Sequence, residues 1–164
     1  MSPLSIVIMI LIIYVPHIAM HVLKRYYLKT KVTFEFIPNV LLIMSGVLYF
    51  IARLLPEPNL TKESVTLLQH FVGGGFVSTH YFFYIKTELK IRLPFLLQTI
   101  ILYAVVSTLG VTNELLEFTS TKLHLYEVDG SDVWWDLAAN TLGAFSLYFC
   151  IELVQKLTKT TDKR

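Results

Sequence analysis

The chain has 164 residues, of which 54% are hydrophobic and only 16% are charged, and its mean hydropathy is +0.59. So much apolar surface cannot be buried inside so small a body, which excludes a water-soluble globular domain and a disordered chain. A single cysteine excludes a disulfide framework, and a net charge of +2 gives no indication of nucleic-acid binding. We therefore interpret residues 1–164 as one integral membrane domain.

Five apolar segments are long enough to cross the hydrocarbon core, which takes about 20 residues of α-helix. In chain order they are Leu4–Val22, Phe34–Leu55, Ser64–Ile85, Leu93–Phe118 and Val133–Leu157. The first segment ends in a basic pair without a small-residue cleavage site, so we interpret it as a retained helix and not a signal peptide. The prediction is an all-α, polytopic membrane bundle of five transmembrane helices.

Basic residues alternate between the connecting segments and give the orientation. The loops after the first and third spans and the tail after the fifth are rich in lysine and arginine, whereas the other two loops are not. Because short basic loops stay in the cytoplasm, we expect the N-terminus outside and the C-terminus in the cytoplasm. The expected location is the cell membrane, with several passes and the lipid bilayer as the surrounding partner.

The first two spans carry prolines and histidines within their apolar runs. Pro16 and Pro38 predict kinks, which neighbouring polar groups can satisfy in a membrane helix. His17 and His21 are four apart and face the same way, a spacing that can hold a metal. Since the glutamate of a zinc-protease motif is absent between them, we interpret them as histidines that reach the membrane interface.

The third span carries His70 two turns from its outer end, followed directly by Gly73, Gly74 and Gly75. Glycines inside a helix cost roughly 1 kcal/mol each relative to alanine, so three in a row need a reason. We favour close helix packing through small residues. The alternative is that bare backbone lines a pocket beside His70.

Half of the 12 acidic residues lie in the stretch from Glu114 to Asp136, which the topology places outside. Glu114 and Glu117 share a helical face near the outer end of the fourth span, and Asp136 and Asn140 share one at the start of the fifth. Ionisable groups at membrane depth are costly and usually face the bundle interior or a wet cavity. We expect these four residues and His70 to converge on one ligand-binding pocket near the outer leaflet.

The carboxylates of Glu114, Glu117 and Asp136 are candidate metal ligands, because oxygen ligands without cysteine suit magnesium or calcium. A divalent cation is therefore the candidate cofactor, and His70 is the candidate proton carrier. Structural pairing between helices is the alternative for this cluster. We interpret the remaining acids of the stretch as a solvated loop and a helix cap: Glu127, Asp129 and Asp132.

Three stretches resemble the VanZ-like family of small integral membrane proteins: Gln69-His70-Phe71, Asn113-Glu114-Leu115-Leu116-Glu117, and Asp136-Leu137-Ala138-Ala139-Asn140-Thr141-Leu142-Gly143-Ala144. They fall in spans three to five, and the chain itself resembles a divergent member of that family. The loop before Asp132 lacks the arginine that such proteins commonly carry, and Glu117 stands where they commonly have glutamine. The resemblance implies a multi-span envelope protein, linked in one named case to glycopeptide antibiotic resistance, without an agreed reaction.

Three functions stay open on this basis. The first is binding of a polar ligand, such as a lipid head group or a glycopeptide, at the outward acidic pocket. The second is a metal-dependent, membrane-embedded enzyme acting on a lipid or envelope precursor, and the third is a purely structural subunit. The sequence contains no serine nucleophile elbow, no His-Glu-x2-His motif and no phosphate-cradling loop, so we favour binding, with the enzyme as the alternative.

Overall fold

The computed structural model describes residues 3–31, 35–55, 67–123 and 133–161. These residues form helices and no strand, which confirms the all-α prediction. Short π-helical turns (η) extend two of the helices. The elements are α1 (Pro3–Val22), η1 (Leu23–Tyr27), α2 (Phe36–Leu54), η2 (Phe71–Phe76), α4 (Val77–Glu88), α5 (Phe95–Lys122) and α6 (Val133–Thr161).

Four of the described helices are long and apolar enough to cross a membrane: Ile6–Tyr27, Phe36–Leu54, Phe95–Lys122 and Val133–Thr158. They coincide with the predicted first, second, fourth and fifth spans, and the chain is a multi-pass membrane protein. The predicted third span is described from residue 67 onward, as a helical segment that runs through η2 into α4. This segment is not among the four, because its histidines, glycines and hydroxyl residues lower its apolar character.

The position of α4 explains why this segment is less apolar than the others. One core cluster groups Tyr84 of α4 with Leu42 of α2. A second cluster groups Phe82 of α4 with Leu102 of α5 and Tyr148 of α6. Because α4 contributes to both clusters, protein and not lipid surrounds much of its surface, so it does not need a continuous apolar exterior.

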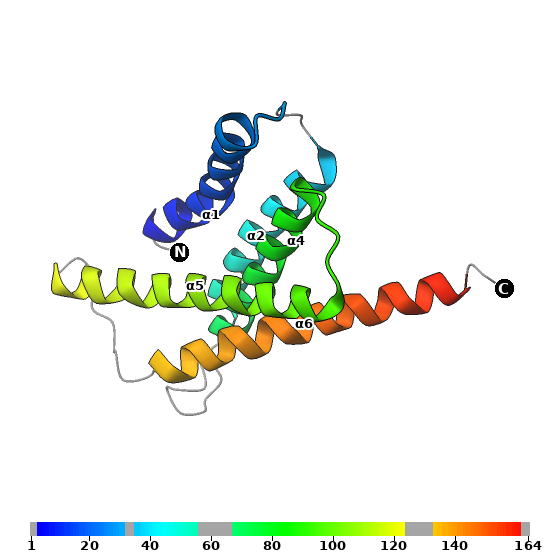
Figure 1. Ribbon diagram of the computed structural model, residues 1–164. Coiled ribbons are helices and arrows are strands. Elements are labelled where there is room, and N and C mark those ends of the chain that lie inside the picture. Colours follow the sequence, from blue (N-terminus) through cyan, green and yellow to red (C-terminus); the bar gives the residue numbers. More distant parts are fainter. Residues whose placement is uncertain (1–2, 32–34, 56–66, 124–132, 162–164) are drawn as a thin grey trace.

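The helices form two sets that cross one another (Figure 1). The segments α2 and α4 pack side by side with α1 against them, while α5 and α6 pack beside each other and cross this group. The most extensive contact in the described part of the chain joins η2 to α6, two elements far apart in the sequence. This contact brings the start of the third segment against the start of α6.

The two prolines occupy different positions in their helices. Pro16 lies inside α1, as expected. The helix α2 begins at Phe36, so Pro38 falls in its first turn, where no backbone N–H needs an intrahelical partner. The prediction of an internal kink at Pro38 is therefore wrong, and the residue is a compatible part of a helix start.

Candidate functional site

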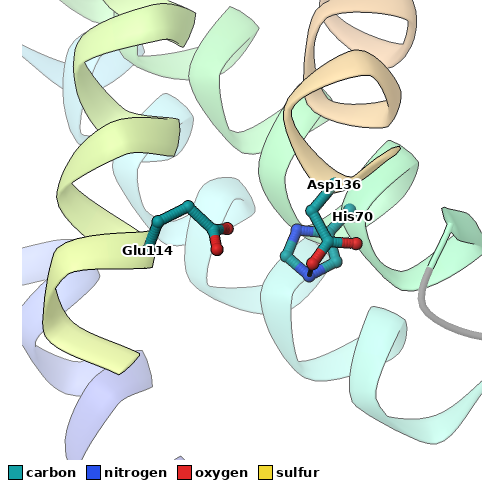
Figure 2. A group of neighbouring side chains, drawn as sticks. All are labelled: His70, Glu114 and Asp136. Carbon is teal, nitrogen blue, oxygen red and sulfur yellow. Dashed lines mark ion pairs between the residues drawn. The ribbon is translucent and has the colours of Figure 1, made fainter. Parts of the chain in front are cut away.

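Three side chains from three separate helical segments meet at one end of the crossing helices. His70, Glu114 and Asp136 each offer one ligand atom, and these atoms lie within 4.8 Å of one another. Figure 2 shows the Glu114 carboxylate extending from α5 toward the adjacent side chains of His70 and Asp136. The structure thus brings together three of the five residues that the sequence predicted to share a pocket.

The closest pair in this cluster is His70 and Asp136. The Nε2 atom of His70 lies 3.3 Å from Oδ2 of Asp136, and this ion pair is drawn as a dashed line in Figure 2. Asp136 is 3% exposed, and His70 and Glu114 are partly buried. The three groups are therefore at least partly shielded from solvent, in surroundings where interactions between charged groups are stronger than in water.

Local helix geometry positions each of the three residues. His70 immediately precedes η2 and has helical backbone angles, so its side chain is fixed at the start of the π-helical turn. Glu114 lies on α5, and Asp136 lies in the first turn of α6, where a negative charge also suits the helix dipole. π-helical turns inside helices frequently accompany functional sites.

A second layer lies one helical turn further into the same three segments. Gly74 follows His70 by four residues, Asn140 follows Asp136 by four, and Gly110 precedes Glu114 by four. A Cβ atom built on Gly74 would lie 1.7 Å from Oδ1 of Asn140, and one built on Gly110 would lie 3.3 Å from Nδ2 of Asn140. The Asn140 side chain therefore occupies the space between two glycines, directly beneath the three ligand-bearing residues.

The glycines also allow the backbones of η2 and α6 to approach closely. A Cβ atom on Gly143 would lie 2.1 Å from the carbonyl oxygen of Phe71, and one on Gly75 would lie 2.7 Å from that of Asn140. Backbone atoms cannot rotate away as a flexible side chain can. This geometry agrees with the packing role that we favoured for the glycines, and it leaves His70 at the edge of a rigid contact.

The structure does not place Glu117 in the cluster of three. Its Oε1 atom accepts a hydrogen bond of 2.9 Å from Nδ2 of Asn113, on the same helix. A spacing of three residues rotates Glu117 by about 60° from Glu114 and moves it about 4.5 Å along the axis. The predicted loop acids Glu127, Asp129 and Asp132 lie outside the described residues.

A second polar region lies at the opposite end of α4, where the sequence predicted interfacial histidines but no ion pair. Lys24 of η1 donates to the Glu88 carboxylate, and each of these residues is only 7% exposed. The pair borders a small pocket that His17 and His21 also line. Glu88 is an isolated acid among basic residues at the end of a predicted span, a signal that could have indicated such a pair.

Comparisons with known proteins give no assignment, since no family model, curated protein or solved structure matches the chain. The VanZ-like resemblance therefore stays a prediction. The chemistry of the site has to be inferred from its own geometry.

An imidazole nitrogen with two carboxylate oxygens forms a donor set that can bind a divalent cation. With metal–ligand bonds of about 2.0–2.1 Å, neighbouring ligands in a tetrahedral zinc site lie about 3.4 Å apart. The 3.3 Å between His70 and Asp136 matches this spacing. Glu114, whose ligand atom lies within the 4.8 Å limit, reaches the same spacing by a side-chain movement of at most about 1.5 Å.

Proposed function

We propose that this chain is a VanZ-like envelope protein of the cell membrane that binds a divalent cation at its outer face and uses it to hold a polar ligand. The ligand class is a lipid head group or a glycopeptide. One observation carries the proposal: His70, Glu114 and Asp136 come from three segments, and their ligand atoms gather within 4.8 Å. Ionisable side chains at membrane depth are costly, so their convergence favours a functional site.

The imidazole changes the metal class that we propose. Carboxylates alone suit magnesium or calcium, which prefer oxygen ligands. A site with one imidazole nitrogen and two carboxylates suits zinc or iron, because imidazole is a better ligand for these ions than for magnesium or calcium. Bound at the site, such a cation would balance the carboxylate charges of Glu114 and Asp136, and it would attract a phosphate or carboxylate group of the ligand.

Five spans with the N-terminus outside are part of this proposal. The cluster takes one residue from the start of the third segment, one from the outer half of α5 and one from the first turn of α6. These positions meet on one side of a membrane if the segments alternate in direction. The Lys24–Glu88 pair lies at the other end of the third segment, on the side that carries most of the basic loops.

An enzyme is the second candidate, supported by the number of protein ligands. Structural zinc sites use four protein ligands, whereas catalytic sites use three and keep the fourth position for water or substrate. The cluster offers three. A cation there would supply Lewis-acid chemistry, while His70, Glu114 and Asp136 would hold and orient it.

Elemental analysis and lipid mass spectrometry on one detergent-purified sample test the proposal. We expect close to one equivalent of a transition metal in the wild-type protein, and a co-purifying lipid if the ligand is a head group. Asp136→Asn should lose the metal and keep the helical circular dichroism signal. Glu117→Gln, on the same helix as Glu114 but outside the cluster, is the matched control and should retain the metal. A wild-type protein that binds no divalent cation on reconstitution would contradict the proposal.

The orientation has its own test, in a background in which the exposed Cys150 is replaced by alanine. A cysteine at Gly130 should react with an impermeant thiol reagent added to intact cells. A cysteine at Thr30 should react only after the membrane is opened. The opposite pattern would overturn the orientation and with it the outward placement of the site.

A further inference from the structure

The layer beneath the candidate cation site contains a buried polar atom, the side-chain oxygen of Asn140. Asn140 is 3% exposed, and its Oδ1 atom has no hydrogen-bond partner among the described residues. A buried amide oxygen without a hydrogen bond costs roughly 1–3 kcal/mol. A residue that served only to fill space between helices would avoid this cost if it were leucine. The amide therefore indicates a partner that belongs to the site.

The position of Asn140 limits which partner this is. Asn140 follows Asp136 by one turn on α6, and its amide lies between Gly74 and Gly110, one turn from His70 and Glu114 respectively. All three segments are thus offset by the same four residues between the two layers. The amide lies below the cluster, on the side of the contact between η2 and α6 and away from the loops.

The spacing of the two layers distinguishes direct ligation from ligation through water. Four residues of helix rise about 6 Å. A direct metal–oxygen bond spans only about 2.1 Å, whereas a bound water adds a hydrogen bond of about 2.8 Å and reaches about 5 Å in total. A water-mediated contact therefore suits a side chain one full turn below the ligand-bearing residues better than a direct bond does.

We infer that Asn140 is a positioning residue for the site, and that its Oδ1 accepts a hydrogen bond from a water molecule held in the fourth position of the cation. The inference rests on the proposed cation site and deepens it. Outer-sphere partners of this kind orient the coordinated groups and exclude other geometries. Asn140 in this position thereby favours a compact four-ligand cation of the zinc class over calcium, which takes six to eight oxygens.

Gly74 and Gly110 leave the space that the Asn140 side chain occupies. A side chain at position 74 would occupy the place of Asn140 Oδ1, since its Cβ would lie 1.7 Å from that atom. Gly110 is a weaker constraint: a Cβ atom there would lie 3.3 Å from Nδ2 of Asn140, a tight contact that a small shift of the side chain relieves. The glycines therefore allow a polar group to reach a depth that two helices with ordinary side chains would close.

Cobalt(II) is a suitable probe, because it occupies zinc sites and its visible spectrum reports coordination number and ligand geometry. The full-length protein in detergent micelles is titrated with cobalt(II) alone. Asn140→Leu, which keeps the branched shape of the side chain and removes the oxygen, should lower the cobalt affinity by about 10–100-fold and alter the visible spectrum. Asn140→Asp, which keeps an oxygen at the same place, should bind cobalt at least as tightly as the wild type.

Thr141→Val is the matched control on the same helix. Its hydroxyl donates a 2.8 Å hydrogen bond to the carbonyl of Leu137 within α6, so removing it should leave both affinity and spectrum unchanged. A purely structural Asn140 would change stability in the Leu variant without changing the spectrum of bound cobalt.

The outcomes separate the inference from the proposal on which it rests. An Asn140→Leu protein with the affinity and spectrum of the wild type overturns the inference and leaves the cation site standing. If that variant does not fold, an Asn140→Asp protein that binds cobalt more weakly than the wild type overturns it equally. A wild-type protein that binds no cobalt contradicts the proposed function itself.

Discussion

The two ends of the third segment differ in how their buried charged residues are balanced. At the end that we propose to be cytoplasmic, one lysine pairs with one glutamate, Lys24 with Glu88, and both are buried. At the outer end the cluster consists of two carboxylates, Glu114 and Asp136, and one imidazole. A one-to-one pair of opposite charges is complete without a ligand. Two carboxylates beside an imidazole form instead a donor set for a cation, and this difference is the basis for proposing a structural role at one end and binding at the other.

The largest expected effect concerns the Lys24–Glu88 pair. Glu88→Ala leaves a buried lysine without its counter-charge and should lower the free energy of unfolding by about 3–5 kcal/mol. The matched control is Glu35→Ala, because the partner of Glu35 is Lys90, which is 76% exposed at its side chain. An exposed pair of this kind contributes up to about 1 kcal/mol. Denaturant unfolding in detergent measures both.

A double variant tests whether the Lys24–Glu88 pair has only a structural role. Replacing the pair by apolar residues, Lys24→Met with Glu88→Leu, should restore most of the stability, since buried ion pairs are often matched by packed hydrophobic residues. A double variant as unstable as Glu88→Ala would mean that the pair does more than join η1 to α4.

The next effect is stabilisation by the cation itself. Zinc at 100 times its dissociation constant should raise the free energy of unfolding by about 2.7 kcal/mol, because it binds the folded state. Asp136→Asn should abolish this increase, while the Lys24→Met/Glu88→Leu protein should keep it. Loss of zinc stabilisation in the latter protein would show that the two ends are not independent.

The smallest effect compares two close contacts of glycine. Gly143→Ala places a Cβ atom 2.1 Å from the backbone oxygen of Phe71, so η2 must move and the cost should be about 1–3 kcal/mol. Gly46→Ala meets the flexible end of Ile13 at 2.6 Å and should cost less than about 1 kcal/mol. Since His70 adjoins η2, the first variant should also weaken zinc binding. Equal costs for the two would contradict the rigid contact.

The elements of the fold were predictable because apolar length is a local property of the sequence. The four long helices begin and end within a few residues of the predicted spans. The third segment was harder to predict from hydropathy, because other helices surround α4 and permit polar residues that a lipid-facing helix would not tolerate. The kink predicted at Pro38 was wrong because hydropathy alone could not locate the start of α2 at Phe36 to within two residues.

The site was predictable in part, for a geometric reason. His70, Glu114 and Asp136 lie near the ends of successive predicted spans, and spans that alternate in direction would bring such ends together; the structure shows these three side chains together. Helical periodicity could not decide whether Glu117 also joins them, because that depends on how α5 is rotated against α6. The Lys24–Glu88 pair joins residues 64 positions apart. Lys24 was interpreted only as part of a basic loop, and no role was assigned to Glu88 from the sequence pattern.

Zinc K-edge X-ray absorption on the zinc-loaded protein tests the cation site most directly. We predict one imidazole nitrogen and two or three oxygens at about 2.0–2.1 Å, with the imidazole signal lost in His70→Ala. Two imidazoles on the zinc would instead place the ion at His17 and His21, which line the pocket at the other end of the molecule. That result would contradict the assignment of binding to the His70–Glu114–Asp136 cluster.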